Sequence, residues 1–344
     1  MIRVLALNAG SSTLKYGFFE ATSEDERELL SDAITVDSSD SQAQALAVSE
    51  VLRRLHESAF EPQGIGHRIV FGGPRHLAHE IITPSVIADL RAEAIYDPLH
   101  LPIALDAVEA ASRAYPGIPQ IACYDTAFHA SLPLVTRRLP IARELYPEIQ
   151  RYGFHGLSYE YVRSQLGERA NGRVVIAHLG SGASMAALRD GKPVDTTMGL
   201  TVLGGIMMGT RSGDLDPGVV LRLFQDGRTL GEVTDLLTNR CGLFGVSGET
   251  EDVRELLARR STDAAAAEAL ELFAYIARKA VGALAAALGG LDRLVFTGGI
   301  GENAADVRAA ICGGLGYLGA VVEVVATDED AMIARHTAAL VAKA

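Results

Sequence analysis

The stretch that decides the fold is Arg3-Val-Leu-Ala-Leu-Asn-Ala-Gly-Ser-Ser12, which returns later as Arg173-Val-Val-Ile-Ala-His-Leu-Gly-Ser-Gly182. Each copy is an apolar strand that runs into a Gly-Ser turn, and each turn leads into a second strand-like stretch, at 14–20 and at 183–188. Glycine lets backbone N–H groups approach an anion closely, and serine hydroxyls add donors. Two such units predict two halves of like fold whose turns hold the phosphates of one nucleotide. A pair of ordinary β-hairpin turns is the alternative interpretation.

Size and composition limit the class of protein. The chain has 344 residues, of which 48% are hydrophobic and 22% charged, so two globular domains are expected. A net charge of −12 argues against a nucleic-acid partner, because the phosphate backbone would be repelled. Cys123, Cys241 and Cys312 are widely spaced, which fits a reducing compartment and neither a disulfide framework nor a zinc site. The longest apolar run, 280–291, is too short to span a bilayer, and the N-terminus lacks a signal-peptide pattern. We therefore expect a soluble, cytoplasmic protein.

Strands alternate with helices along the chain, so the predicted class is α/β. Helices are predicted at 42–57, 84–94, 101–115, 159–166, 217–225, 230–238, 252–259, 264–288, 303–313 and 329–341. Strands are predicted at 4–8, 14–20, 32–36, 64–70, 120–124, 294–297 and 321–325, with a hairpin over 174–188. The segment 195–217 is polar, rich in glycine and long for a loop, and such loops are usually functional or disordered. Because it holds apolar residues and an arginine between its glycines, we interpret it as functional.

A third glycine turn lies in Phe296-Thr-Gly-Gly-Ile-Gly-Glu-Asn303, where a buried strand runs into glycines and then a helix. This order presents backbone N–H groups and a helix N-terminus to an anion or a nucleotide. The segment has neither the Gly-Lys-Ser/Thr ending of a Walker A loop nor the spacing of the dinucleotide fingerprint. A tight strand–helix turn is the alternative.

Two arginines stand beside glycines. Arg68 follows a strand and precedes a glycine pair, and Arg211 lies in the long glycine loop. The planar, permanently charged guanidinium suits carboxylate and phosphoryl oxygens, so two such side chains could neutralise a transferring phosphoryl group. Surface arginines or structural ion pairs are the alternatives.

Other polar candidates stand at the ends of predicted elements. Asp125 follows a strand, where ligands gather in open α/β sheets, and could hold Mg²⁺ or position a substrate; it could equally cap a helix. His155 could donate a hydrogen bond to a charged oxygen or be structural, and His178 ends the strand before the second turn. Asn8 and Glu329 could be Mg²⁺ ligands or plain caps. The residues alone leave these alternatives open.

Taken in order, these motifs resemble the acetokinase family over nearly the whole chain. The matching stretches are Asn8–Lys15, Gly66–Val70 with Gly72-Gly73, Pro98–His100, Asp125–His129, Arg151–Gly156, His178–Gly180, Met207–Pro217, Gly242–Gly248 and Phe296–Asn303. The resemblance implies the two-domain sugar-kinase and actin-like ATPase fold, a duplicated βββαβαβα core with ATP in the cleft. It places the first phosphate turn and the acyl substrate in 1–126 plus 329–344. It places the second turn, the adenosine site and a homodimer interface in 127–328.

The resemblance also implies roles for individual residues. The catalytic set is Asp125, Arg68, Arg211 and His155, and the Mg²⁺ ligands are Asn8 and Glu329. The small carboxylate substrate would lie against Arg68, Val70, Leu99 and Phe154. The nucleotide would contact Lys15, His178, Gly180, Ser181, Gly182, Asp252, Arg254, Gly299, Ile300 and Asn303.

The chain departs from the family pattern in several places. It is short, and material is missing between Glu20 and Gly64 and between Gly319 and Thr327. Other positions carry residues that are unusual for the family: Ser181 in place of Asn, Val202 and Gly204 in place of Pro and Glu, and Phe71 in place of His. The usual proline helps to close the acyl pocket, so the sequence leaves open which carboxylic acid is the preferred substrate.

The implied activity is reversible, Mg²⁺- and ATP-dependent phosphorylation of acetate to acetyl phosphate by direct in-line transfer. A carboxylate has a pKa near 4–5, so at neutral pH it needs no general base, and the protein supplies positioning and charge stabilisation. Alternatives are a propionate or butyrate kinase, a pyrophosphate-dependent kinase, and a non-catalytic nucleotide-binding relative.

Overall fold

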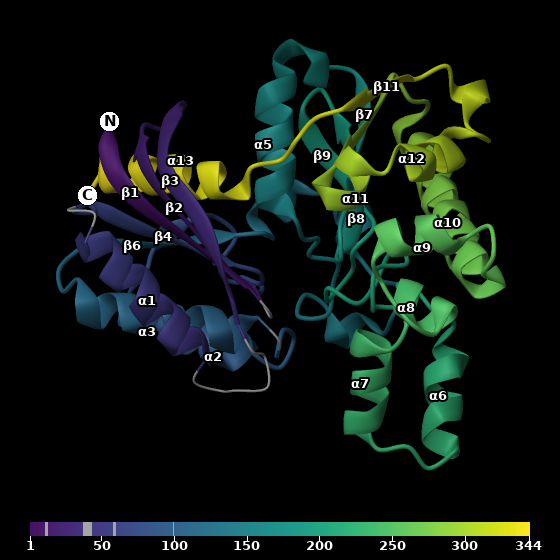
Figure 1. Cartoon of the computed structure of the whole chain (residues 1–344), viewed down its shortest axis with the longest axis horizontal. Helices are drawn as coiled ribbons and strands as arrows, with labels where there is room; N and C mark the ends of the chain where they lie inside the picture. The colour runs from purple at the N-terminus through teal and green to yellow at the C-terminus, as the bar shows by residue number, and fades with distance from the viewer. Residues whose placement is uncertain (11–12, 37–42, 58–59, 99) are drawn as a thin grey trace. The chain divides into compact units, whose positions relative to one another are not determined.

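The chain folds into two compact units (Figure 1). The computed structural model describes residues 1–10, 13–36, 43–57, 60–98 and 100–344. The first unit comprises Met1–Ala130, Phe154–Tyr161 and Asp328–Ala344, and the second comprises Ser131–Gly153 and Val162–Thr327. Residues 127–130, 154–161 and 328, predicted within the domain 127–328, belong to the first unit. At 154–161 the N–H of Gly156 donates to the carbonyl of Asp125 at 2.9 Å.

The first unit contains a six-stranded sheet in the order β3-β2-β1-β4-β6-β5. Its strands are β1 (Ile2–Ala9), β2 (Thr13–Ala21), β3 (Glu26–Thr35), β4 (Gly64–Ile69), β5 (Glu80–Ile81) and β6 (Gln120–Tyr124). Strands β1, β2 and β3 form an antiparallel meander, whereas β1, β4 and β6 are parallel. The carboxyl ends of these three parallel strands therefore lie at one edge of the sheet.

Alternation of side chains in β1 builds a core on each face of this sheet. Leu5 and Leu7 pack among buried residues of α1 and α3, whereas Val4 and Ala6 pack against α13. The helices of this unit are α1 (Ala43–Glu57), α2 (Pro84–Glu93), α3 (Leu101–Ala114) and α13 (Glu329–Val341), and α5 (Gly156–Leu166) begins in it. Because successive strand residues point to opposite faces, an uninterrupted apolar strand is what a sheet covered on both sides requires.

The second unit repeats this topology. Its sheet has the order β11-β10-β7-β8-β9, again a three-strand antiparallel meander followed by two parallel strands. The strands are β7 (Arg173–Leu179), β8 (Ala183–Arg189), β9 (Lys192–Thr196), β10 (Arg293–Thr297) and β11 (Val321–Val324). Strands β1 and β7 hold equivalent places, so the duplicated fold predicted from the two matching stretches is confirmed.

The helices of the second unit differ greatly in length. They are α4 (Leu134–Arg137), α6 (Pro217–Gln225), α7 (Leu230–Asn239), α8 (Gly242–Ser247), α9 (Val253–Arg259), α10 (Ala264–Leu288), α11 (Gly298–Asn303) and α12 (Ala305–Cys312). Asp263 begins α10 by accepting the N–H groups of Ala265 and Ala266, and Gly289 ends it in the left-handed conformation at φ +73°. Within the described part of the chain, no helix has the length and apolar character needed to cross a membrane.

Several elements differ from the sequence prediction. Strand β3 begins at Glu26, whereas the predicted strand begins at 32. The first half of β3 has no alternation of apolar and polar residues that would indicate a strand, because β3 is an exposed edge strand. Strand β9 and the short helices α4 and α8 were not predicted, and α11 begins within the glycines that were interpreted as a turn. Helix α5 begins at Gly156 instead of 159.

His67 in β4 is predicted to make stability depend on pH. It is 2% exposed, and burial lowers its pKa to about 4. Its Nε2 lies 2.6 Å from the amide of Gln120, which satisfies both partners when the amide nitrogen donates to the ring. The unfolded chain, with an ordinary histidine pKa near 6.5, binds the proton first, so stability is lost as the pH falls from about 6.5 towards 4.

We expect His67 alone to remove roughly 2–3 kcal/mol of stability between pH 7.5 and pH 4.5. Urea unfolding of the protein and of His67→Met at both pH values measures this contribution. The cost of the substitution should be clearly smaller at pH 4.5 than at pH 7.5. An equal cost at the two pH values contradicts the prediction.

Candidate active site

Three predicted site residues meet at the carboxyl edge of the first sheet. Asn8 lies near the end of β1, Arg68 near the end of β4, and Asp125 directly after β6. The parallel registers bring them to the same edge: Leu7 pairs with His67, which precedes Arg68, and Arg68 pairs with Cys123, two residues before Asp125. This edge is where open α/β sheets bind ligands.

Arg68 is the centre of this group. Its Nη2 and Nε donate to Oδ2 of Asp125 at 2.6 and 3.1 Å, and its Nη1 donates to Oδ1 of Asn8 at 3.2 Å. The same Nη1 lies 3.7 Å from a carboxylate oxygen of Glu329. The guanidinium is therefore oriented by partners from β1, β6 and α13.

The first turn of α13 supplies two carboxylates. Nδ2 of Asn8 donates to Glu329 at 3.2 Å and to Asp330 at 3.1 Å, so the amide of Asn8 links Arg68 to this turn. Asp330 was missed in the sequence analysis. The available signal was a second acidic residue at the start of a helix, which is ordinary at a helix N-terminus and so did not stand out.

The group of Arg68, Asp125, Glu329 and Asp330 carries excess negative charge. Burial raises the pKa of Asp125 to about 6, and Arg68 opposes this rise. Desolvation also raises the pKa of Asp330 to about 6. Burial works against the charged form of Arg68, yet Asp125 and Glu329 together raise its pKa above the ordinary value. Near neutral pH the guanidinium of Arg68 thus faces three carboxylates, which favours a bound divalent cation.

Two further observations bear on what this group could bind. Oδ1 of Asp125 is buried, and none of the residues that the structure describes forms a hydrogen bond to it. Lys15 is opposite Asn8 in the β1–β2 pairing, and its charge opposes the rise that burial causes in the pKa of Asp330. The phosphate role implied for Lys15 stays a prediction.

His155 and Phe154 reach this unit through a close backbone contact. His155 has φ +59°, which is unusual for a residue with a side chain, and Gly156 follows it with its N–H bonded to Asp125. A Cβ at Gly156 would lie 2.1 Å from the carbonyl oxygen of Asp125. Only glycine permits this approach, so the backbone beside His155 is tied to the end of β6.

An apolar wall lies in the same unit. Val70 is 3% exposed and Phe154 is 1% exposed, and the ring of Phe154 stacks on Phe71 with centroids 6.1 Å apart. Tyr96 also packs against Phe71, with ring centroids 5.7 Å apart. Leu99, the remaining member of the predicted acyl pocket, lies outside the described residues.

The two glycine turns have similar hydrogen bonds. The N–H of Gly10 donates to the carbonyl of Thr13 at 2.8 Å, and the N–H of Gly180 donates to that of Gly182 at 3.0 Å. The serines of the first turn, 11 and 12, lie outside the described residues. His178 is the residue before the last of β7, as predicted for a strand that ends at the second turn.

The second turn has a partner that the sequence did not indicate. Oγ of Ser181 donates to Glu251 at 3.0 Å, and the N–H of Gly209 donates to the carbonyl of Ser181 at 2.9 Å. A Cβ at Gly209 would meet the same Glu251 carboxylate at 1.9 Å. Ser181, which replaces the usual Asn, thus joins its turn to the segments around 209 and 251.

Arg211 is held within an ordered loop. Its Nη1 donates to the carbonyl of Val202 at 2.9 Å, and its own carbonyl accepts the N–H of Met208 at 3.1 Å. Gly242, at φ +61°, passes so near this loop that a Cβ there would lie 2.2 Å from the carbonyl of Met208. The loop has little regular structure, yet close backbone packing defines its conformation.

The residues predicted to contact adenosine are mostly exposed in the second unit. Asp252 caps α9 and forms a 2.5 Å ion pair with Arg254, whose side chain is 90% exposed. Nδ2 of Asn303 donates to the carbonyl of Gly299 within α11. Ile300 is on the same helix.

The N-terminus of α11 is already occupied by a side chain. Glu302 accepts the N–H of Gly298 at 2.9 Å and the N–H of Thr327 at 3.1 Å. A Cβ at Gly298 would also lie 2.8 Å from the carbonyl of Leu179, so this glycine allows a close strand–helix turn. The N–H group of Gly298, at the start of this turn, is thus bonded within the protein.

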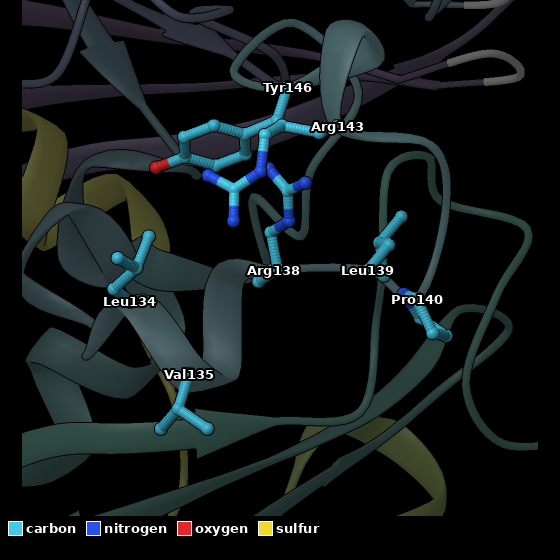
Figure 2. Close-up of a pocket in the computed structure, with 7 residues that line it drawn as sticks. All are labelled: Leu134, Val135, Arg138, Leu139, Pro140, Arg143 and Tyr146. Atoms are coloured by element: carbon cyan, nitrogen blue, oxygen red, sulfur yellow. The ribbon is translucent and has the colours of Figure 1, made fainter.

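A surface hollow of about 530 Å³ in the second unit involves none of the predicted site residues (Figure 2). Its lining is Leu134, Val135, Arg138, Leu139, Pro140, Arg143 and Tyr146. The guanidinium of Arg138 lies 4.6 Å from the ring centroid of Tyr146, a cation–π contact. The hollow has no carboxylate, histidine or glycine turn, so it does not match the chemistry predicted from the sequence.

Comparison with known proteins identifies the family. The model of the Acetokinase family matches residues 29–342. This chain belongs to the acetokinase family. The acetate kinase of Rhodopseudomonas palustris (strain ATCC BAA-98 / CGA009) is 41% identical over 389 aligned positions, which cover 97% of each protein. Since the alignment is longer than the 344-residue chain, that relative carries segments that are absent here.

Solved structures agree with the acetokinase assignment. The acetate kinase of Porphyromonas gingivalis has a TM-score of 0.83 at 32% identity, covering 98% of this chain and 99% of that one. A propionate kinase from Francisella tularensis has a TM-score of 0.86 at 31% identity with the same coverage. A ROK hexokinase from Thermus thermophilus, at 14% identity and TM-score 0.50, shares the fold alone. The fold is thus that of the sugar kinases and actin-like ATPases, as the resemblance implied.

Gly156→Ala is predicted to disturb the contact that places His155. The added methyl group would meet the carbonyl of Asp125 at 2.1 Å and Cβ of Phe128 at 2.9 Å, so the start of α5 must move. We expect the free energy of unfolding to fall by about 1–3 kcal/mol, as for other overpacked sites. Gly231→Ala is the matched control, because nothing lies near its Cβ and alanine favours a helix. Equal urea stability of the two variants would refute the prediction.

Proposed function

We propose that this chain is an acetate kinase that transfers the γ-phosphoryl group of ATP to acetate and gives acetyl phosphate and ADP, reversibly. The observation that carries the proposal is the guanidinium of Arg68, held by Asp125 and Asn8 at the carboxyl edge of the first sheet. Guanidinium has five N–H donors, and the three hydrogen bonds described here leave two for a substrate carboxylate. The relatives named acetate kinase support the same assignment.

Phosphoryl transfer requires that the protein position acetate and ATP and stabilise the charge on the moving phosphoryl group. A carboxylate oxygen of acetate forms the new bond to the γ-phosphorus, while the bond from that phosphorus to the bridging oxygen of ADP breaks. Acetate is ionised at neutral pH, so no proton is removed by the protein. We assign Arg68 to the substrate carboxylate, and Arg211 and His155 to the charge on the moving phosphoryl group.

The residues present fit a Mg²⁺ ion. Oxygen ligands are what Mg²⁺ prefers, and Asn8, Asp125, Glu329 and Asp330 supply carboxylate and amide oxygens around one arginine. The buried Oδ1 of Asp125, to which no described residue donates, supports this assignment. Asn8 and Glu329 would hold the ion, with Asp125 and Asp330 acting directly or through water. Bound Mg²⁺ would neutralise charge on the phosphate oxygens.

The nucleotide assignment rests on the turns and on the family. We propose that the turns at Gly10 and at Gly180–Gly182, with Lys15 and His178, contact the phosphates of ATP. Ser181 belongs to the second of these turns, and the contacts proposed for adenosine and the α-phosphate are Asp252, Arg254, Gly299, Ile300 and Asn303. A homodimer in the cytoplasm is the assembly and location that we propose from the same resemblance.

Propionate is the second candidate substrate. The apolar wall of Val70, Phe71 and Phe154 is suited to a short alkyl group, and one structural neighbour is a propionate kinase. Val202 stands where the family usually has a proline that closes the acyl pocket. Replacement of that proline favours a pocket that accepts a longer acid.

The test is Mg²⁺- and ATP-dependent acyl phosphate formation, trapped with hydroxylamine, with acetate, propionate and butyrate side by side. We expect kcat/KM to be highest for acetate. A higher value for propionate or butyrate moves the assignment to that acid. No product with any acid, from a folded protein that binds ATP, contradicts the kinase assignment and indicates a non-catalytic relative.

Arg211→Ala in the same assay distinguishes this enzyme from a contaminating kinase of the expression host. We expect kcat to fall by roughly 10³-fold, as when other arginines are removed from phosphoryl-transfer sites. Arg228→Ala is the control, because Arg228 is exposed. Near-normal kcat in Arg211→Ala would show that the role assigned to this arginine is wrong.

A further inference from the structure

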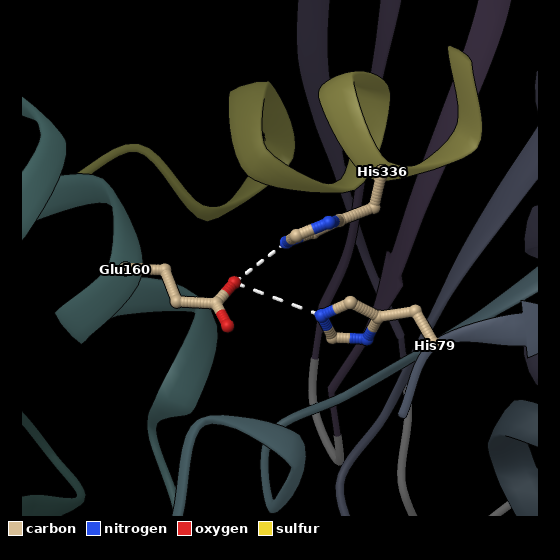
Figure 3. Close-up of side chains that lie close together, drawn as sticks. All are labelled: His79, Glu160 and His336. Atoms are coloured by element: carbon tan, nitrogen blue, oxygen red, sulfur yellow. Dashed lines mark hydrogen bonds and ion pairs between the residues drawn. The ribbon is translucent and has the colours of Figure 1, made fainter. Parts of the chain in front are cut away.

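Two imidazoles and a carboxylate converge in the first unit, apart from the groups assigned above (Figure 3). Nε2 of His336 lies 2.6 Å from Oε2 of Glu160, and Nε2 of His79 lies 3.6 Å from the same oxygen. The two rings are 3.8 Å apart between centroids. The three side chains are 12–25% exposed. We call them the His79–Glu160–His336 cluster.

The cluster has the residue types of a zinc site, since two histidines and a glutamate are zinc ligands in other proteins. The N–H of Tyr124 donates to Nδ1 of His79 at 3.0 Å, so this nitrogen acts as an acceptor. A metal-bound histidine normally donates its second ring N–H to an acceptor, which is the opposite arrangement. Neutral His79 must therefore carry its proton on Nε2, facing Glu160. This tautomer favours a hydrogen-bonded cluster over a metal site.

The electrostatics agree with a carboxylate that accepts a hydrogen bond from His336 and lies 3.6 Å from the ring nitrogen of His79. Burial works against the charge of Glu160, but hydrogen bonds from His336 and His79 lower its pKa to about 2. Burial lowers the pKa of His79, which keeps that ring neutral near pH 7. Glu160 is thus ionised and gains a defined position between the two imidazoles.

Each member of the cluster is connected to a residue of the proposed active site, either along the chain or through a hydrogen bond. His79 binds the N–H of Tyr124, and Tyr124 precedes Asp125. Asp125 in turn accepts the N–H of Gly156, four residues before Glu160 on α5. The path from Glu160 through His79, Tyr124, Asp125 and Gly156 therefore returns to Glu160.

His336 adds α13 to this path. It lies seven residues after Glu329, which is two helical turns along the same face of α13. Besides its apolar contacts with the sheet, α13 is bonded to β1 through Asn8 and to β3 through the ion pair of Arg335 with Glu26. The hydrogen bond between His336 and Glu160 adds a directed tie from α13 to α5.

We propose that Glu160 is a positioning residue: through His79 and His336 it locks α5 and α13 to the end of β6, and so sets His155 and Glu329 relative to Asp125. This inference rests on the proposed phosphoryl transfer, because it assigns Glu160 an effect on that reaction. Glu160 touches neither Arg68 nor the apolar wall in any described contact, so binding of the acid should survive its loss.

The test compares Glu160→Gln with Glu168→Gln, an exposed glutamate-to-glutamine control. The Glu160 variant keeps the shape and one acceptor oxygen, but it loses the negative charge that strengthens the hydrogen bond with His336. We expect kcat to fall at least tenfold while KM for acetate changes less than about twofold; the control should match the parent enzyme. Unchanged kcat, or a loss confined to KM, overturns the inference.

Substitution of His336 keeps the inference testable if Glu160→Gln does not fold. Glutamine at 336 can still donate an N–H to Glu160, so His336→Gln should keep most of kcat, whereas His336→Leu should lose as much as Glu160→Gln. Equal activity of these two variants overturns the inference.

Two further outcomes are separable. Stoichiometric zinc in the purified enzyme that is lost in His336→Leu would overturn the hydrogen-bonded cluster in favour of a metal site. An inactive parent enzyme refutes the proposed function and the inference with it, whereas an active parent with fully active Glu160→Gln refutes the inference alone.

Discussion

The buried ion pair between Arg68 and Asp125 is the interaction on which the first unit's site depends. Asp125 has no exposed side-chain surface, and a buried carboxylate without a partner is strongly unfavourable. Two N–H groups of Arg68 meet that need, and the third described bond of the guanidinium reaches Asn8. Because Asn8 also bonds to Glu329 and Asp330, the ends of β1, β4 and β6 and the start of α13 are joined by one arginine.

The proposed phosphoryl transfer requires charged side chains that are held in fixed positions, as Arg68 is held by its partners. Transfer between an ionised acid and ATP needs no nucleophile–base pair, so the protein contributes by holding charged groups in fixed places. Fixed positions are costly to obtain from long, flexible side chains alone. The close contact at Gly156 and the His79–Glu160–His336 cluster supply that rigidity through backbone and carboxylate–imidazole hydrogen bonds.

Much of the fold could be predicted from the repeated strand-and-turn stretch, because a strand buried on both faces must consist of apolar residues, and such a run is visible in the sequence. The elements that were predicted wrongly lack such an apolar run: β3 is mostly exposed, and α11 begins in glycines. Asn8, Arg68, Asp125 and Glu329 were predicted and do lie together. Asp330 was missed because local spacing cannot show which face of α13 meets Asn8, and the bond between Ser181 and Glu251 joins residues 70 positions apart. The roles of Arg211 and of the nucleotide contacts stay predictions.

A double-mutant cycle on Arg68 and Asp125 tests the central claim most directly. Urea unfolding at pH 7, without substrates, would be measured for the parent, Arg68→Met, Asp125→Asn and the double variant. Arg68→Met should cost about 3 kcal/mol or more, since it leaves the buried carboxylate of Asp125 without its cation. Asp125→Asn should cost less, because Arg68 keeps Asn8 and Glu329 as partners. The double variant should cost clearly less than the sum, with a coupling energy of at least about 2 kcal/mol. Costs that add to within about 0.5 kcal/mol would show that the pair does not organise the site.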